Sequence, residues 1–168
     1  MSMHSYPLTE SACFFLDETA AMFVLLKHAI DDNALQPKIQ ELIDKHGMNK
    51  VVYDNLIPEK YIDEYQDVQF AMELLIDEVD DIAWAGDFEG EINTKWPEKC
   101  EDTEPLSLNI DDNFVLYIRP AKDADFFSQA YSNPEQMCDE FRNKMSDYLP
   151  NDFPFWKYIV SLSGTYYC

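Results

Sequence analysis

The stretch PEKYIDEYQDVQFAMELLIDEVDDI, from Pro58 to Ile82, decides the fold that we expect for this chain. Its apolar residues recur alternately four and three positions apart, which is the spacing of one face of an α-helix. Pro58 suits a first helical turn, where no backbone N–H is needed, and Gly86 follows as a stop signal. The pattern predicts one long amphipathic helix, and its apolar face, which we expect to pack on the core, consists of Tyr61, Tyr65, Val68, Met72, Leu75, Val79 and Ile82.

The remaining surface of this predicted helix is acidic. Many of its carboxylates lie three or four residues apart, where like charges destabilise an exposed helix by roughly 0.2 to 0.5 kcal/mol per pair. The acids from Asp77 to Asp81 would also crowd the negative end of the helix dipole. Local helix stability therefore does not explain this arrangement of charges. Besides the single base Lys60, the segment carries the acids Glu59, Asp63, Glu64, Asp67, Glu73, Asp77, Glu78, Asp80 and Asp81.

Length and composition predict one folded domain. The chain has 168 residues, of which 46% are hydrophobic, and this is enough for a single core but short for two domains. Aromatic residues make up 14%, which argues against an acidic disordered chain. We expect residues 1–168 to form a single α+β domain, with residues 1–8 as a flexible tail.

The rest of the chain supplies further helices and a small sheet. Thr9 to Ile30 reads as a buried helix, broken near Asp17, which would cap a second helix from Glu18. A strand over Ala12 to Leu16 is the alternative. We expect a mostly antiparallel sheet packed against three to five helices, including the long acidic one. The remaining elements, in chain order, are a helix over Pro37–His46 ended by Gly47, a strand or a helix approach over Val51–Ile57, an irregular strand over Ala83–Trp96, an acidic loop over Pro97–Pro105, a β-hairpin over Leu106–Ile118, a helix capped by Asn133 that runs to Pro150, and an interior strand over Phe155–Leu162.

Motifs of catalysis are absent from the sequence. There is no phosphate-binding glycine loop, no nucleophile elbow and no H-E-x-x-H, and the chain has only 4 glycines. The 3 histidines and 4 cysteines are scattered without the spacing of a metal or redox site. We expect no enzyme activity, no cofactor and no metal. The scattered thiols and the lack of a signal-peptide pattern favour the cytoplasm.

Net charge limits the partners. The chain carries 33 acidic and 12 basic residues, a formal net charge of −21, so we expect it to bind neither naked nucleic acid nor an anionic membrane. A basic protein would be attracted instead. On one continuous helix, the acids from Glu59 to Asp81 would present a charge every ~4 Å of axis, close to the ~3.4 Å between phosphates of one DNA strand.

The sequence therefore favours a non-enzymatic, DNA-mimic-like inhibitor that covers the basic nucleic-acid-binding surface of a restriction or CRISPR-type nuclease, as anti-defence proteins of phages and mobile elements do. This similarity to a functional class is compositional. An immunity or antitoxin protein against one basic toxin is the first alternative, a metal-dependent carboxylate enzyme is the second, and charge that serves only solubility is the simplest reading. The aromatic residues could be interface anchors or core. The expected partner-binding residues are Asp63, Glu64, Asp67, Glu73, Asp77, Glu78, Asp80, Asp81, Trp84, Asp87, Phe88, Glu89, Glu91 and Trp96.

Overall fold

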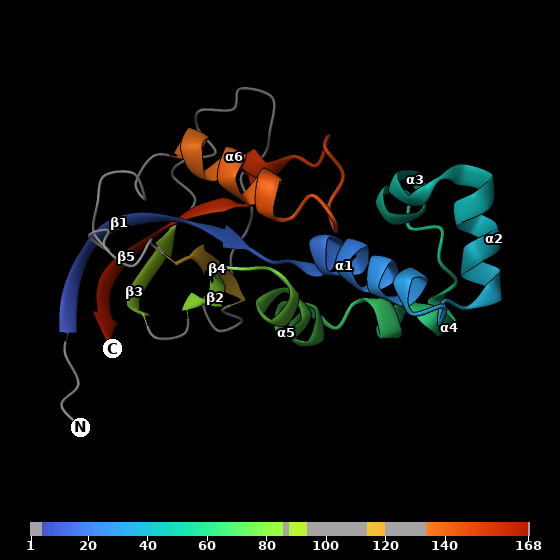
Figure 1. Ribbon diagram of the computed structural model, residues 1–168, viewed down its shortest axis with the longest axis horizontal. Coiled ribbons are helices and arrows are strands. Elements are labelled where there is room, and N and C mark those ends of the chain that lie inside the picture. Colours follow the sequence, from blue (N-terminus) through green and yellow to red (C-terminus); the bar gives the residue numbers. More distant parts are fainter. Residues whose placement is uncertain (1–4, 86–87, 94–113, 120–133, 168) are drawn as a thin grey trace.

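The fold is an α+β domain with a single sheet (Figure 1). A computed structural model describes residues 5–85, 88–93, 114–119 and 134–167. These ranges contain five strands, all paired antiparallel, and six α-helices. The predicted α+β domain with a small antiparallel sheet is confirmed, with more helices than the three to five that we expected. None of the helices in the described ranges is long and apolar enough to cross a bilayer.

The sheet has the order β2-β4-β1-β5-β3. Its strands are β1 (Ser5–Phe15), β2 (Ile82–Trp84), β3 (Phe88–Asn93), β4 (Val115–Ile118) and β5 (Ile159–Tyr167). The edge strands β2 and β3 are consecutive in the chain, and the four steps from Trp84 to Phe88 span at most about 14 Å. Five flat strands would hold the two edges about 19 Å apart. The sheet must therefore curl, and the curl brings the end of β2 close to the start of β3.

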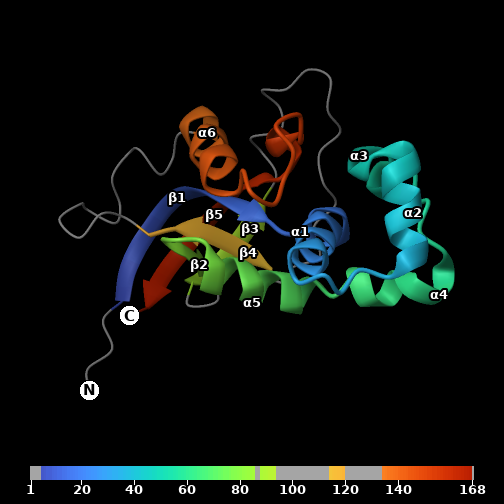
Figure 2. The ribbon, with the colours of Figure 1, turned by 45° about the vertical axis from the view of Figure 1, so that its right-hand side comes forward.

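Phe14 of β1 is the centre of the aromatic core. It is fully buried, and its ring lies 5.4 Å from that of Phe141 in helix α6 (Pro134–Lys144) and stacks at 5.6 Å on Tyr158. Phe153 and Phe155 complete the cluster. Helix α6 lies over β1 and β5, as Figure 2 shows. The core is thus built where the central strand, α6 and the segment before β5 meet.

Helix α1 (Glu18–Asp31) joins the sheet to the helical half of the molecule. The Asp17 carboxylate accepts a hydrogen bond from the Ala20 backbone N–H at 2.9 Å and caps the helix, as predicted. Before this cap the chain is a strand, so the open choice over Ala12–Leu16 is settled in favour of β structure. Helix α1 packs against α5 (Val68–Glu78) and α3 (Met48–Tyr53), and α2 (Pro37–His46) packs on α3.

The single long helix predicted over residues 58–82 is wrong. The chain forms α4 (Glu59–Ile62), the 3-10 turn η1 (Asp63–Tyr65), α5 and strand β2. Gln66 leaves the helical conformation, and the Asp67 carboxylate accepts from the Phe70 backbone N–H at 3.1 Å, which starts α5 anew. At the other end Asp81 adopts a positive φ of 66°, and the chain then turns into β2.

The apolar stripe of that segment is nevertheless inside. Tyr65, Met72, Leu75 and Ile82 are buried, and Tyr61, Val68 and Val79 are partly buried against the same core. Each fragment keeps its own apolar side inward although the helix axis is interrupted. The spacing therefore identified the buried residues correctly but not the continuity of the helix.

Other boundaries also differ from the prediction. Strand β1 begins at Ser5, so residues 5–8 are not a flexible tail. Residues 83–96 contain two strands where we predicted one, residues 48–53 form helix α3, and residues 155–157 form the 3-10 turn η5 before β5. Helix α2 has the bounds that we predicted and ends at Gly47, whose φ is 86°. The first strand of the predicted hairpin, the acidic loop and the Asn133 cap lie outside the described residues.

Candidate partner-binding surface

The carboxylates between residues 59 and 81 are all exposed, but they do not form one track. They are distributed over α4, η1, α5 and the turn that follows α5, and they are Glu59, Asp63, Glu64, Asp67, Glu73, Asp77, Glu78, Asp80 and Asp81. The expected DNA-like spacing required one straight helix axis, so that geometric argument is wrong. What the structure leaves is a series of short acidic arrays on consecutive elements.

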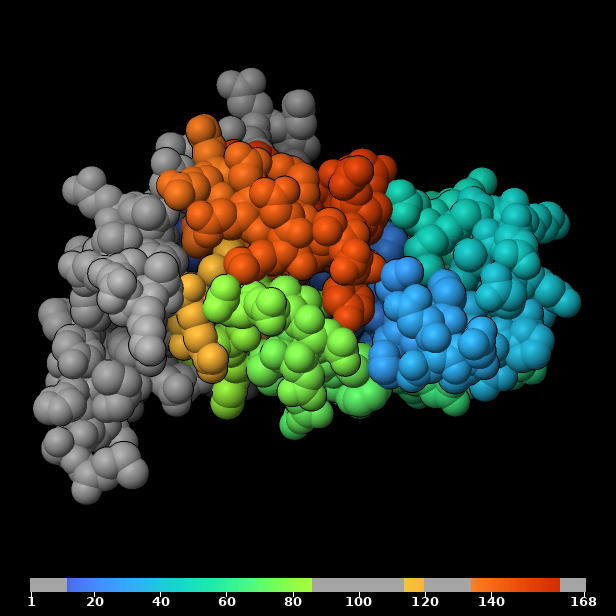
Figure 3. Space-filling view, in the orientation of Figure 1, coloured from blue at the N-terminus to red at the C-terminus, as the bar shows by residue number. Residues whose placement is uncertain are grey.

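The solvent face of α5 carries one such array. Phe70, Glu73 and Asp77 are three and four residues apart and are all exposed, so they lie on the side of α5 opposite the buried Met72 and Leu75. Phe70 is 44% exposed. In the space-filling view, α5 occupies the front of the molecule between α1 and α6 (Figure 3). This helix thus presents an aromatic ring beside two carboxylates.

Ion pairing differs between this segment and the other helices. On α1, α2 and α6 acids have basic neighbours in the same helix, as in Lys27–Asp31 at 3.2 Å. In the part of the chain that the structure describes, the segment 59–81 has one ion pair, between Asp81 and Lys144 at 3.5 Å. Its own base, Lys60, lies over the ring of Tyr61 instead. The negative charge of this segment is therefore largely uncompensated. The remaining pairs on the other helices are Lys38–Glu41 and Arg142–Asp139, together with His28–Asp32, which is an ion pair only when His28 is protonated.

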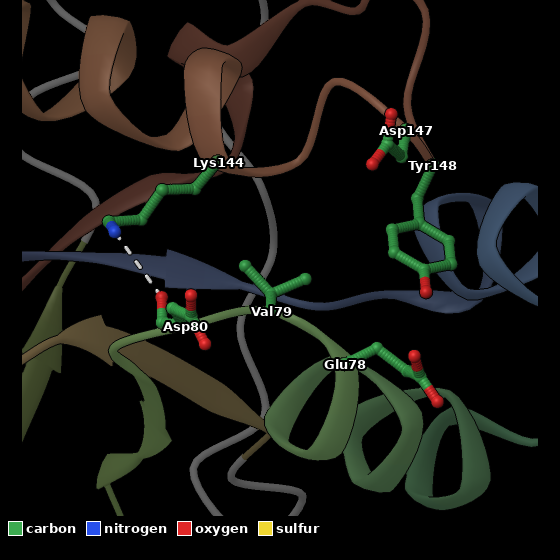
Figure 4. Close-up of a pocket in the computed structure, with 6 residues that line it drawn as sticks. All are labelled: Glu78, Val79, Asp80, Lys144, Asp147 and Tyr148. Carbon is green, nitrogen blue, oxygen red and sulfur yellow. Dashed lines mark hydrogen bonds between the residues drawn. The ribbon is translucent and has the colours of Figure 1, made fainter.

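A polar groove lies beside the end of α5. It has a volume of about 340 Å³ and is lined by Glu78, Val79, Asp80, Lys144, Asp147 and Tyr148. Figure 4 shows Lys144 and Asp80 on one side of Val79, and Glu78, Asp147 and Tyr148 on the other. The Lys144 ammonium donates to the Asp80 carbonyl at 3.3 Å and is thereby held at its own side of the groove.

The electrostatics of the groove are visible at Tyr148. Burial raises the pKa of its phenol, and the nearby carboxylates of Glu78, Asp31 and Asp147 raise that pKa further. The phenol therefore stays neutral at physiological pH, and three acids from three different elements surround it. Asp31 is paired with Lys27, whereas Glu78 and Asp147 have no ion-pair partner among the described residues.

The predicted aromatic anchors have different environments. The Trp84 side chain on β2 is 47% exposed, so it is not a core residue. Phe88, Glu89 and Glu91 belong to β3, the other edge strand, which the curl of the sheet brings close to β2. Asp87 and Trp96 lie outside the described residues.

Two cysteines and the Asp17–Tyr158 pair belong to the core and to a helix cap rather than to this surface. Cys13 and Cys138 are buried, and burial raises the pKa of the Cys13 thiol to about 12, so this thiol stays protonated. The described ranges contain no group of three or more His, Cys, Asp and Glu side chains that could hold a metal ion. Asp17 is used as a helix cap, and Tyr158, hydrogen-bonded to it, is part of the aromatic core.

Sequence reasoning missed the far wall of the groove. Lys144 ends α6, and Asp147 and Tyr148 follow that helix. All three lie more than sixty residues after Glu78, and only tertiary packing brings them to α5. Nothing in the local sequence signals this contact. Comparisons with protein-family models, with curated proteins and with solved structures find no match for the chain.

Proposed function

We propose that this chain is a non-enzymatic acidic inhibitor that binds the basic nucleic-acid-binding surface of a partner protein. A restriction or CRISPR-type nuclease of a host defence system is the kind of partner that fits, with the chain acting as an anti-defence protein. The observation that carries the proposal is the largely uncompensated charge of α4, η1, α5 and the turn after α5, in which Asp81 alone has an ion-pair partner within the described ranges. On α1, α2 and α6 the same chain pairs acids with neighbouring bases.

This contrast favours binding over solubility alone. Charge that serves only solubility needs no particular position, and a few interspersed bases would remove local repulsion while the net charge stays far from zero. Glu73 and Asp77 repel at i,i+4, and both Asp77 and Glu78 lie at the negative end of the α5 dipole. A segment that retains such unfavourable pairs with few bases nearby, whereas Asp31, Glu41 and Asp139 on the other helices each pair with a base, fits a role in which the carboxylates meet cations of another molecule.

Aromatic side chains support the assignment to a protein partner. Phe70 and Trp84 are two of the most exposed large hydrophobic residues among those described. Aromatic rings inside a polar rim commonly anchor protein interfaces. Phe70 lies directly beside Glu73 and Asp77 on α5, so a partner that binds the carboxylates would also cover its ring.

The mechanism replaces phosphates with carboxylates. Lysine and arginine side chains that would hold a nucleic-acid backbone would instead pair with the acidic arrays, and nucleic acid would compete for the same surface. Short arrays on separate elements can meet separate cations of a groove, so a continuous helical track is not required. Binding of this kind weakens as salt is added.

The test uses two triple variants that change the net charge equally. The first carries Asp63→Asn, Glu73→Gln and Asp77→Asn, and the control carries Glu41→Gln, Asp44→Asn and Asp54→Asn on α2 and directly after α3, helices that lie apart from α5 (Figure 1).

Purified restriction and CRISPR-type nucleases are assayed for DNA cleavage at low salt with each protein. We expect inhibition by the wild-type chain and by the control. The first variant should be weaker by about threefold to 150-fold, since exposed ion pairs contribute about 0.2 to 1 kcal/mol each. Equal potency of the two variants, or no inhibition of any nuclease by the wild-type chain, would contradict the proposal.

The groove favours a second candidate, an immunity or antitoxin protein that neutralises one cognate basic toxin. A localised pocket with Glu78, Asp147 and Tyr148 suits the binding of one specific cationic side chain better than it suits the imitation of a repeated row of phosphates. Competition separates the two functions. Nucleic acid should displace an inhibitor that covers a nucleic-acid groove, whereas a chain bound only at a toxin's active site can remain bound.

A further inference from the structure

We propose that the groove between the end of α5 and the turn after α6 is the anchor site for one arginine side chain of the basic partner. The groove is the cavity of about 340 Å³ that is lined by Glu78, Val79, Asp80, Lys144, Asp147 and Tyr148. This inference rests on the proposed function, because it names the part of the acidic surface that would recognise one specific residue.

The charges of the groove favour a cation. Glu78 comes from α5 and Asp147 from the turn after α6, so carboxylates stand on two opposite walls (Figure 4). The C-terminal end of α5 contributes the negative end of its dipole at the same place. The cation already present, Lys144, is held by the Asp80 carbonyl and the Asp81 carboxylate. The side of the groove beyond Val79 therefore keeps two acids, Glu78 and Asp147, that have no ion-pair partner within the described ranges.

Tyr148 makes the groove more than a group of acids. Its ring forms a wall between Glu78 and Asp147, and its hydroxyl points toward α5 (Figure 4). The ring offers a face for a cation, and the phenol oxygen offers an acceptor. Burial, and then the surrounding carboxylates, raise the pKa of the phenol, so the hydroxyl stays neutral beside those acids. A positive guest would offset the mutual repulsion of the carboxylates around it.

Arginine fits these walls better than lysine does. Its planar guanidinium can receive a carboxylate in a bidentate pair and at the same time lie flat on an aromatic ring. An ammonium group is a more strongly hydrated point charge and cannot use both features together. Val79, half-buried at the floor of the groove, can contact the aliphatic part of an arginine side chain.

The probe for the test is a capped hexa-arginine peptide, with a capped hexa-lysine peptide for comparison. The ¹⁵N-labelled full chain is titrated with each peptide at low salt, and amide shifts locate the site. The groove variant carries Glu78→Gln and Asp147→Asn. A control with the same change of charge carries Asp44→Asn and Asp54→Asn on α2 and after α3. All four acids are exposed, so the variants should keep the wild-type spectrum apart from local changes.

We expect saturable shifts at residues 78–81 and 144–148 and tighter binding of hexa-arginine than of hexa-lysine. The Kd of hexa-arginine should rise about twofold to thirtyfold in the groove variant, as expected for two exposed charge pairs at about 0.2 to 1 kcal/mol each, and much less in the control.

Two results would overturn the inference, and they differ in their meaning for the proposed function. If hexa-arginine binds but its shifts map to Glu73 and Asp77, with equal Kd in both variants, the groove is not the anchor and the acidic interface remains. If neither peptide binds at low salt, both the inference and the proposed function fail. If both peptides bind with equal affinity and shift the amides of the groove, the groove is a general cation site without specificity for arginine. This result would also overturn the inference.

Discussion

Replacing Asp77 by lysine should stabilise the fold although it removes a native charge. Asp77 belongs to the last turn of α5 and follows Glu73 by four residues, and the side chains of both residues are exposed. The repulsive i,i+4 pair would become an attractive one in its favourable orientation, a change of about 0.4 to 1 kcal/mol. Removing an acid from the negative end of the dipole adds about 0.3 to 1 kcal/mol. We therefore expect a gain of about 0.7 to 2 kcal/mol in the free energy of unfolding.

The control is Glu41→Lys on α2, which changes the net charge by the same amount. Glu41 pairs with Lys38 at 3.7 Å, so reversing the charge of residue 41 should remove this attraction and leave α2 no more stable than before. Urea unfolding followed by circular dichroism measures both variants, and Asp77→Asn should fall between wild type and Asp77→Lys. A shift in thermal midpoint of roughly 1 to 8 °C is expected for Asp77→Lys. If both reversals stabilise equally, the total charge matters rather than its position, and the argument that α5 retains specifically unfavourable pairs is refuted.

Further predictions concern the cap residues and the core. Burial raises the pKa of Asp17 above its ordinary 3.8, so the folded state holds the proton more tightly and loses stability as pH rises through this carboxyl's folded pKa. Asp17→Asn keeps a capping side chain without this titration, so its stability relative to wild type should increase with pH, whereas parallel urea-unfolding curves would contradict the assignment. Asp67→Ala should lower the free energy of unfolding by about 0.5 to 2 kcal/mol and Asp67→Asn by much less, and equal losses would mean that the cap does not start α5. Phe14→Ala should cost about 3 to 5 kcal/mol because Phe14 is fully buried among aromatic rings, and a loss under 1 kcal/mol in the same assay would place the core elsewhere.

The sequence predicted best where local signals were complete. Helix α2 begins at Pro37 and stops before Gly47 as expected, since proline suits a first turn and glycine supplies the positive φ that ends the helix. Asp17 was recognised as a cap because it separates two apolar runs. Such elements need only neighbouring residues to define them.

The long helix failed because the same periodicity fits a broken helix. Asp67 could have signalled the break, since aspartate before an apolar run is a preferred cap. The end at Glu78 depends on Ile82–Trp84 pairing with β4, a strand more than thirty residues later. Asp80 and Asp81 therefore lie just beyond the C-terminal end of α5, and only Asp77 and Glu78 of the acids predicted at this end belong to its last turn.

The candidate surface was predicted in part. Exposure of the acids follows from the apolar stripe, because the stripe fixes which side faces inward even when the axis is interrupted. The DNA-like spacing required continuity and did not survive the break. The groove required the packing of the turn after α6 against α5, which no local pattern contains.

The most direct test of the account is displacement of DNA from a nuclease that the chain inhibits. Fluorescence anisotropy of a labelled duplex on that nuclease is followed as the chain is added at several salt concentrations. We predict complete release of the duplex, with an apparent affinity that falls steeply as salt rises, and weaker release by the variant that lacks the charges of Asp63, Glu73 and Asp77. A stable ternary complex of nuclease, duplex and chain, or release that is independent of salt, would contradict the claim that these carboxylates occupy the nucleic-acid-binding surface.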